Sequence, residues 1–154
     1  MKKLFLTMLV VLMSVSAMAQ DKKYGVGINL LYGTKIENIG FGVKGQYYAT
    51  EAVRVEANAA YFMEKNDWKM WDVNLVGHYL IPVADKMSVY PLAGIGITNW
   101  STNVFNGKIK FAIDLGGGFQ FDVAEDFAVN AEVKYQIIQD FNQAVFAIGA
   151  VYKF

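Results

Sequence analysis

The sequence predicts an all-β protein in which eight antiparallel strands close into an up-and-down transmembrane β-barrel. Three observations lead to this fold class. Apolar and polar residues alternate with period two along most of the chain, which indicates strands with two different faces. Strand-like segments recur eight times between residues 24 and 154. The apolar faces carry more aromatic rings than the interior of an eight-stranded barrel can hold.

The N-terminus is predicted to be a targeting segment. It has a basic start, an apolar run over residues 4–15 and a small-x-small cleavage site that ends at Ala19. The apolar run is too short to cross a bilayer as a helix, which favours a secretory signal peptide over an anchor. We therefore expect residues 1–19 to be cleaved and residues 20–154 to form one β-barrel domain.

Composition excludes several classes of function. Two of the 14 basic residues lie in the signal peptide, which leaves 12 basic against 14 acidic residues and a net charge of −2. No basic surface remains that would indicate a nucleic-acid partner. The chain has no cysteine, which excludes a disulfide scaffold and cysteine-based metal sites. The mature chain has no second apolar run of helix-spanning length, so a membrane form must be a closed barrel.

Eight segments fit strands, and their starts are 14 to 22 residues apart. This spacing is wider than in a small sandwich and leaves room for strands of about 9–11 residues. The predicted strands are Tyr24–Tyr32, Ile39–Ala49, Val53–Met63, Lys69–Ile81, Met87–Thr98, Ile109–Phe121, Phe127–Ile137 and Ala144–Phe154.

The alternation is clearest in the seventh predicted strand. Its apolar face consists of Phe127, Val129, Ala131, Val133, Tyr135 and Ile137. Its polar face consists of Asn130, Glu132, Lys134 and Gln136. The first, second and sixth strands alternate in the same way, with glycines among the residues of the polar face.

Alternation alone leaves open which face points inward, because a soluble lipocalin-type barrel is apolar inside. The glycine-rich, sparsely charged faces suit a crowded lumen better than a surface in water. We therefore expect the apolar faces to point outward to lipid. Fifteen rings lie on them: Tyr24, Tyr32, Phe41, Tyr47, Tyr61, Trp71, Tyr79, Phe111, Phe119, Phe121, Phe127, Tyr135, Phe146, Tyr152 and Phe154.

The end of the chain resembles the C-terminal insertion signal of outer-membrane β-barrel proteins, which the barrel-insertion machinery reads. The resemblance lies in an apolar alternation that ends on a free carboxylate. The residues that carry it are Phe146, Ile148, Ala150, Tyr152 and Phe154.

The mature chain as a whole resembles the small eight-stranded outer-membrane β-barrel family, the OmpX-like and porin-family proteins. The stretches Y-P-L-A-G-I-G-I (Tyr90–Ile97) and D-L-G-G-G-F-Q-F (Asp114–Phe121) and the terminal V-Y-K-F carry the likeness. The resemblance implies a monomer in the outer membrane of a Gram-negative cell, in contact with outer-membrane lipid. It also implies periplasmic chaperones and the insertion machinery as partners during biogenesis. Pro91 departs from the pattern, and we interpret it as the frayed periplasmic start of strand five.

An even number of strands with both termini in the periplasm fixes the predicted topology. Periplasmic turns are then expected at Thr50–Ala52, Pro82–Lys86 and Asp122–Asp126. Short outer loops are expected at Gly33–Asn38, Glu64–Trp68, Asn99–Lys108 and Ile138–Gln143.

Polar residues on the inward faces form a predicted lumen network. Enclosed charges must be paired, because each unpaired charge costs several kcal/mol. Strand register predicts Lys134 as a cross-strand neighbour of Asp114, and Lys44 as a diagonal neighbour of Glu56. The predicted network consists of Lys44, Arg54, Glu56, Asp72, His78, Lys110, Asp114, Glu132 and Lys134.

The pattern favours a non-enzymatic barrel with a largely plugged lumen that contributes to envelope structure or surface contacts. A narrow porin-like channel for ions or small solutes is the alternative, and a soluble periplasmic ligand-binding barrel is a remote one. Related barrels that modify lipid A use a histidine in the outer leaflet, whereas His78 is predicted near the periplasmic end. We expect no catalytic residues, cofactor or metal site.

Overall fold

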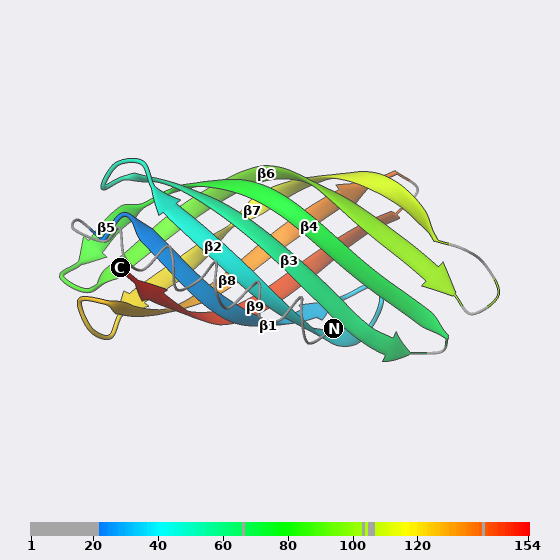
Figure 1. Ribbon diagram of the computed structural model, residues 1–154. Helices are drawn as coiled ribbons and strands as arrows, with labels where there is room; N and C mark the ends of the chain where they lie inside the picture. The colour runs from blue at the N-terminus through cyan, green and yellow to red at the C-terminus, as the bar shows by residue number, and fades with distance from the viewer. Residues whose placement is uncertain (1–21, 66, 103, 105–106, 140) are drawn as a thin grey trace.

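The computed structural model describes residues 22–154 except residues 66, 103, 105–106 and 140. The strands of this part run antiparallel around a closed barrel (Figure 1). The predicted signal peptide, residues 1–19, lies outside the described residues. No helix in the described part is long and apolar enough to cross a membrane.

The barrel closes through two pairings besides those between strands consecutive in the chain. β1 pairs with β9, and β4 pairs with β6. β5 continues β4 beyond Leu80 in the same register against β6, so the two segments act as one strand of an eight-stranded barrel. This confirms the predicted fold class. The segments are β1 (Tyr24–Gly33), β2 (Asn38–Tyr48), β3 (Val53–Lys65), β4 (Trp68–Tyr79), β5 (Ile81–Ala84), β6 (Met87–Thr102), β7 (Lys108–Asp122), β8 (Phe127–Ile138) and β9 (Phe141–Lys153).

The strands extend further than predicted at one end of the barrel. We call this the loop end, because it holds the β1–β2, β3–β4, β6–β7 and β8–β9 connections; the opposite end, with the C-terminus, is the turn end. β6 reaches Thr102 instead of Thr98, and β9 begins at Phe141 instead of Ala144. Hydrogen bonds between neighbouring strands satisfy the backbone N–H and C=O groups there even where the side chains are polar. Because the strands are longer, the loop-end connections are shorter than expected.

The interpretation of Pro91 as a frayed strand start is wrong. Pro91 lies inside β6 and is paired in register with Gly117 of β7. On its other side the pairing with β4 stops at His78–Leu92 and resumes with β5 at Ile81–Val89. Proline has no N–H to give to the ladder. The interruption between β4 and β5 therefore falls opposite the proline.

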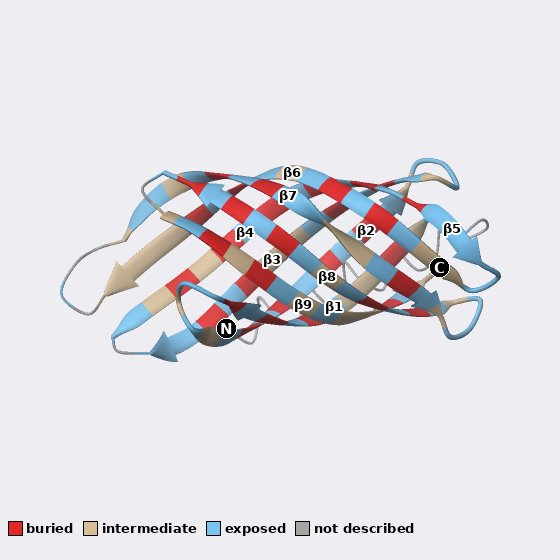
Figure 2. Cartoon of the chain, turned by 180° about the vertical axis from the view of Figure 1, so that it is seen from behind, coloured by how far each residue is buried: buried red, intermediate tan, exposed pale blue. Residues whose placement is uncertain are grey.

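The apolar faces point outward, as predicted. Buried and exposed residues alternate along the strands in Figure 2. Twelve of the fifteen rings assigned to the apolar faces are exposed, and the other three, Tyr24, Trp71 and Phe154, are partly buried. Charged and amide side chains fill the opposite faces, and many are less than 10% exposed. A soluble barrel would show the reverse arrangement.

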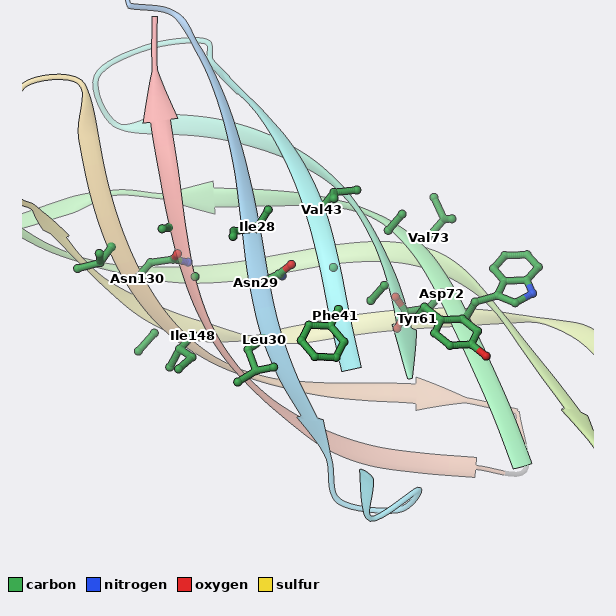
Figure 3. A pocket seen from close by; sticks show the side chains of 18 of the residues that line it. Ile28, Asn29, Leu30, Phe41, Val43, Tyr61, Asp72, Val73, Asn130 and Ile148 are labelled. Atoms are coloured by element: carbon green, nitrogen blue, oxygen red, sulfur yellow. The ribbon is translucent and has the colours of Figure 1, made fainter. Parts of the chain in front are cut away.

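The lipid-facing surface has a shallow apolar hollow across β1–β4 and β7–β9. Ile28, Val43 and Val73 stand around it on β1, β2 and β4 (Figure 3). Small side chains such as Ala59 and Ala131 lie between these larger ones, and this difference in size produces the hollow. The polar residues that border the hollow, Asn29, Asp72 and Asn130, are buried, so the surface that it exposes is mainly apolar.

A charge at mid-depth on this surface should destabilise the barrel. Val133 is 47% exposed near the middle of β8, and Val123 is 50% exposed in the β7–β8 turn. Val133→Arg should cost about 2–4 kcal/mol, because lipid cannot solvate the guanidinium. Val123→Arg, the matched control in the turn, should be close to neutral. Urea titrations of folding into lipid vesicles measure both, and equal losses would contradict the membrane placement.

Candidate functional site

The interior of the barrel is built in layers along its axis. An apolar group near the loop end, which we call the loop-end plug, packs against Ile36, Trp100 and Phe141. A second apolar group, the turn-end cluster, consists of Val76, Leu80, Tyr90 and Leu92. Polar side chains fill the space between the two. The loop-end plug consists of Leu31, Ala60, Phe62, Met70, Ala112, Ile138 and Val145.

Arg54 is the centre of the polar layer near the turn end, and it is fully buried. Its Nε lies 2.9 Å from Nδ1 of His78, and its guanidinium carbon lies 4.8 Å from the ring centroid of Tyr90. It also donates to Gln120 Oε1 at 2.5 Å and to the Tyr48 hydroxyl at 3.3 Å. Hydrogen bonds and aromatic faces thus replace the water that a buried guanidinium loses.

Lys44 joins two carboxylates from opposite sides of the lumen. Its Nζ lies 3.3 Å from Glu132 Oε1 and 3.7 Å from Glu56 Oε2. Glu132 also accepts hydrogen bonds from the Tyr90 hydroxyl and the Asn130 amide. Because both carboxylates share one ammonium and are otherwise hydrogen-bonded, their burial is compensated.

A third polar group lies towards the loop end. Lys134 Nζ lies 3.3 Å from Asp114 Oδ2, and it also interacts electrostatically with Asp72. Asp72 accepts hydrogen bonds from Asn74 and Gln136. One ammonium therefore serves two buried carboxylates.

The residues predicted for the lumen separate into these groups and one outlier. Lys44 and Glu56 are diagonal neighbours across β2 and β3, as register counting indicated. The counting was wrong for Lys134, which pairs with Gly116 and reaches Asp114 along the diagonal. Lys110 lies on β7 at the loop end, where its Nζ donates to the carbonyl of Gln139, away from the buried charges.

The predicted network omitted the neutral members of the interior. Gln46, Asn130 and Gln136 each donate to a buried carboxylate. The period-two pattern places Asn130 and Gln136 on the inward face, but the predicted network was limited to charged residues and His78. Tyr90 was missed because aromatic rings were assigned to lipid, yet it is 1% exposed and its ring lies parallel to His78 at 4.8 Å.

Glycines on neighbouring strands make room for the large interior side chains. A Cβ on Gly118 would overlap the ring of Tyr90, and a Cβ on Gly149 would lie 2.8 Å from Asn130 Oδ1 and 3.2 Å from Lys44 Nζ. An eight-stranded barrel is only wide enough for side chains. The glycine-rich inward faces are therefore a requirement of the crowded lumen.

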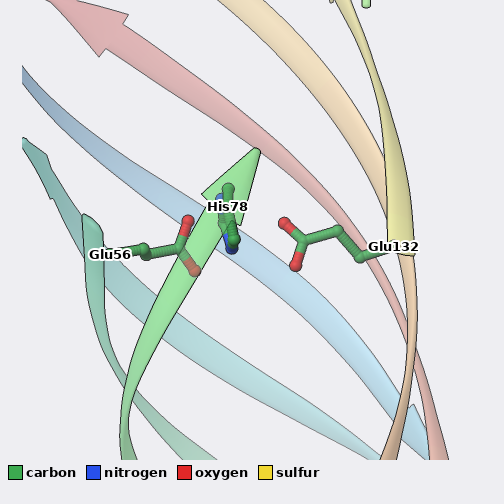
Figure 4. A group of neighbouring side chains, drawn as sticks. All are labelled: Glu56, His78 and Glu132. Atoms are coloured by element: carbon green, nitrogen blue, oxygen red, sulfur yellow. The ribbon is translucent and has the colours of Figure 1, made fainter. Parts of the chain in front are cut away.

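One group of side chains is close enough together for a metal site. One possible ligand atom each of Glu56, His78 and Glu132 lies within 4.8 Å of the others (Figure 4). Arg54 can only donate, so Nδ1 of His78 is the acceptor and the ring proton is on Nε2. A protonated nitrogen cannot ligate a metal. Lys44 already lies between the carboxylates. Glu56 and Glu132 are paired with Lys44 and His78 is bound by Arg54, so the three residues do not fit a metal centre.

The C-terminal residues close the barrel at its turn end. Phe154 donates its N–H to Tyr24 O at 2.9 Å and accepts from Tyr24 N at 3.2 Å, just beyond the end of β9. Phe146, Ile148 and Tyr152 are at least half exposed on the lipid face, whereas Ala150 is partly buried.

Comparison with known proteins agrees with this geometry. A family model described as outer membrane protein beta-barrel domain matches residues 5–154. The chain belongs to this family. No curated protein matches the sequence of this outer-membrane β-barrel protein.

Solved structures of outer-membrane barrels share its fold. Neisserial surface protein A (NspA) is 10% identical over 86% of this chain and 97% of its own, with a TM-score of 0.73. The N-terminal barrel of Pseudomonas aeruginosa OprF is 15% identical over 84% of this chain and 97% of its own, with a TM-score of 0.70. The outer membrane enzyme PagL is 12% identical over 84% of this chain and 99% of its own, with a TM-score of 0.55. Identities this low show the shared fold alone.

Adding a methyl group at Gly118 should test how tightly the lumen of this outer-membrane barrel is packed. Gly118→Ala should destabilise the barrel by about 1–3 kcal/mol, because Tyr90 must move away from its hydrogen bonds and from His78. Gly45→Ala is the matched control, since a Cβ there meets nothing within 4 Å. Urea unfolding in detergent micelles compares the two, and equal effects would contradict the packing argument.

Removing the shared ammonium should cost more than removing one carboxylate. Lys134→Met leaves Asp72 and Asp114 buried together and should destabilise by about 3–5 kcal/mol. Asp114→Asn leaves Lys134 facing Asp72 and should cost less. The double variant should recover part of the loss of Lys134→Met. Unfolding titrations of the three variants decide this, and additive losses would show that the pair does not interact.

Proposed function

We propose that this outer-membrane protein is a non-enzymatic barrel with a plugged polar lumen, which contributes to envelope structure or to surface contacts. The burial of the side chains that face the bore carries the proposal. Phe62, Arg54, Asp114 and Gln136 are all fully buried, although they come from different strands and depths. The walls of a water-filled channel would be accessible to solvent.

The chemistry of the plug supports the same function. Lys44, Arg54 and Lys134 face carboxylates or aromatic groups at hydrogen-bonding or ion-pair distance. Such pairs hold each other in place, because separating them would leave buried charges unpaired. An ion crossing the barrel would have to break these pairs and displace the loop-end plug.

The geometry around the histidine supports a non-enzymatic role. His78 is 2% exposed, and one ring nitrogen is occupied by Arg54. Ser88 and Ser101 of the mature chain lie near opposite ends of β6, so neither forms a nucleophile pair with His78. The PagL fold shows that this architecture can host an enzyme. In this chain, however, His78 is part of the packed interior and is not exposed to a substrate.

The proposal includes how the protein reaches the membrane. Residues 1–19 direct export and are removed. Periplasmic chaperones and the barrel-insertion machinery then act on the chain through its last strand. The termini remain in the periplasm, so the loop end faces outward and the barrel works as a monomer. The similarity in fold to a surface protein, NspA, supports a role in surface contacts.

Planar-bilayer recordings of the mature protein test the plug directly. The wild type should give no discrete single-channel steps at high potassium chloride concentration. Phe62→Ala combined with Met70→Ala should open the loop-end plug and produce measurable conductance. Ile28→Ala on the lipid face is the control and should remain silent. Regular conductance steps in the wild type would favour the narrow-channel alternative.

A further inference from the structure

A pocket of about 450 Å³ lies at the loop end, lined by the β1–β2 connection and by the ends of β3, β4, β6, β7 and β9. Its residues come from both sides of the barrel mouth, and the loop-end plug lies beneath it. Ile36, Trp100 and Phe141 belong to the pocket and also pack against the plug. The pocket therefore has a rigid floor, and its size falls in the range that holds a small organic ligand.

Aromatic rings form the floor and one wall. Trp100 lies edge-on to Phe141 with the ring centroids 4.0 Å apart, and edge-on to Trp68 at 5.9 Å. Trp68 remains 51% exposed, so one of its faces is available to a ligand. The indole N–H of Trp100 is buried and has no hydrogen-bond partner among the described residues. Because this nitrogen is not accessible from the pocket, the aromatic surface offered to a ligand is mainly that of Trp68.

Lysines form the rim. Among the described residues, Lys35, Lys65 and Lys110 line the pocket together with one carboxylate, that of Glu37. Lys65 Nζ is 2.8 Å from the Glu37 carbonyl oxygen and 3.8 Å from its carboxylate. The polar groups around the aromatic floor are thus mainly donors, with a net positive charge. The complementary ligand has hydrogen-bond acceptors and negative charge.

We propose that this pocket binds a saccharide that carries negatively charged groups, such as sulfate, phosphate or carboxylate. A sugar ring presents C–H groups that pack on aromatic faces, with the exposed face of Trp68 as the platform. The lysine ammonium groups attract the anionic substituents as point charges.

Two sources could supply this chemistry. The anionic core sugars of lipopolysaccharide in the same membrane are one, and a free acidic glycan outside the cell is the other. Both require the loop end to face outward, so this inference rests on the proposed orientation. It is independent of whether the lumen conducts ions.

Tryptophan fluorescence offers a direct measurement, because the chain has three tryptophans and two of them line the pocket. In a Trp71→Phe background, only the two pocket tryptophans report. A trisulfated disaccharide should change their emission saturably for the mature protein in phospholipid nanodiscs, and the effect should weaken with added salt. The neutral disaccharide maltose should bind at least tenfold more weakly.

Two sets of variants in that background locate the binding. Lys35→Gln with Lys65→Gln should raise the Kd for the sulfated disaccharide about tenfold, through loss of charge at the rim. Lys22→Gln with Lys86→Gln, the matched pair at the turn end, should leave it unchanged. Trp68→Ala should remove most of the binding, and its heat-modifiable migration on gels shows that the barrel is folded.

Nanodiscs that contain lipopolysaccharide distinguish the two sources. Loss of disaccharide binding in them assigns the pocket to core sugars of the membrane, and unchanged binding assigns it to a free glycan. Each result supports an anionic saccharide site. Absence of a saturable change, equal affinity for maltose, or an equal loss in both lysine pairs would overturn it. A conducting wild-type barrel would overturn the plugged-lumen proposal and leave this one standing.

Discussion

The closed ladder of backbone hydrogen bonds is the constraint on which the rest of this structure depends. In lipid no water is available to satisfy a free N–H or carbonyl, so a sheet must have no open edge. β1 and β9 join the two ends of the chain, and the exchange of hydrogen bonds between Tyr24 and Phe154 extends that seam beyond the last strand. At Pro91, which has no N–H, the ladder from β6 to β4 and β5 is interrupted. On the other side of this segment the ladder to β3 continues, since the N–H of Leu80 donates to Ala52 O. Both strand prolines, Pro82 in β5 and Pro91 in β6, are tolerated because they lie towards the turn end of the barrel.

Closure with eight strands then decides what the interior can contain. The bore is so narrow that each large group needs a glycine or another small residue opposite it, as Tyr90 needs Gly118. Because the outward face must be apolar, polar residues can alternate only on the inward face, where they are enclosed. Their charges are consequently paired, with Lys44 and Lys134 each serving two carboxylates. The tight packing and the charge pairing of the interior both follow from the narrow bore of an eight-stranded barrel.

Much of this could be predicted from the sequence, because period two is a local property that the fold does not alter. The strands, their number and the outward direction of the rings follow from it. Register is a different quantity, since it depends on how far each strand extends. The pairing of Lys134 was misplaced by two residues for this reason, and β6 and β9 proved longer than their apolar cores. The role of Tyr90 in the lumen was not predicted, because its inward position is favourable only when Arg54 and His78 pack against its ring and a glycine lies opposite it. The pocket at the loop end could not be predicted from the sequence either, because its residues come from five strands and one connection.

The two ends of the barrel differ in what they offer to an aqueous partner. At the turn end the buried side chains of Tyr90, Leu80 and Arg54 fill the bore. The ion cluster of Lys44, Glu56 and Glu132 is buried from solvent. At the loop end the plug is apolar and continues outward into Trp100 and Phe141, which leaves aromatic surface beneath a rim of lysines. An aromatic surface there costs little, because Trp100 and Phe141 are already partly buried against the plug. Among the described residues, the polar and aromatic side chains that a ligand could reach therefore lie mainly at the loop end. The same apolar plug that closes the barrel there also supports the floor of the pocket.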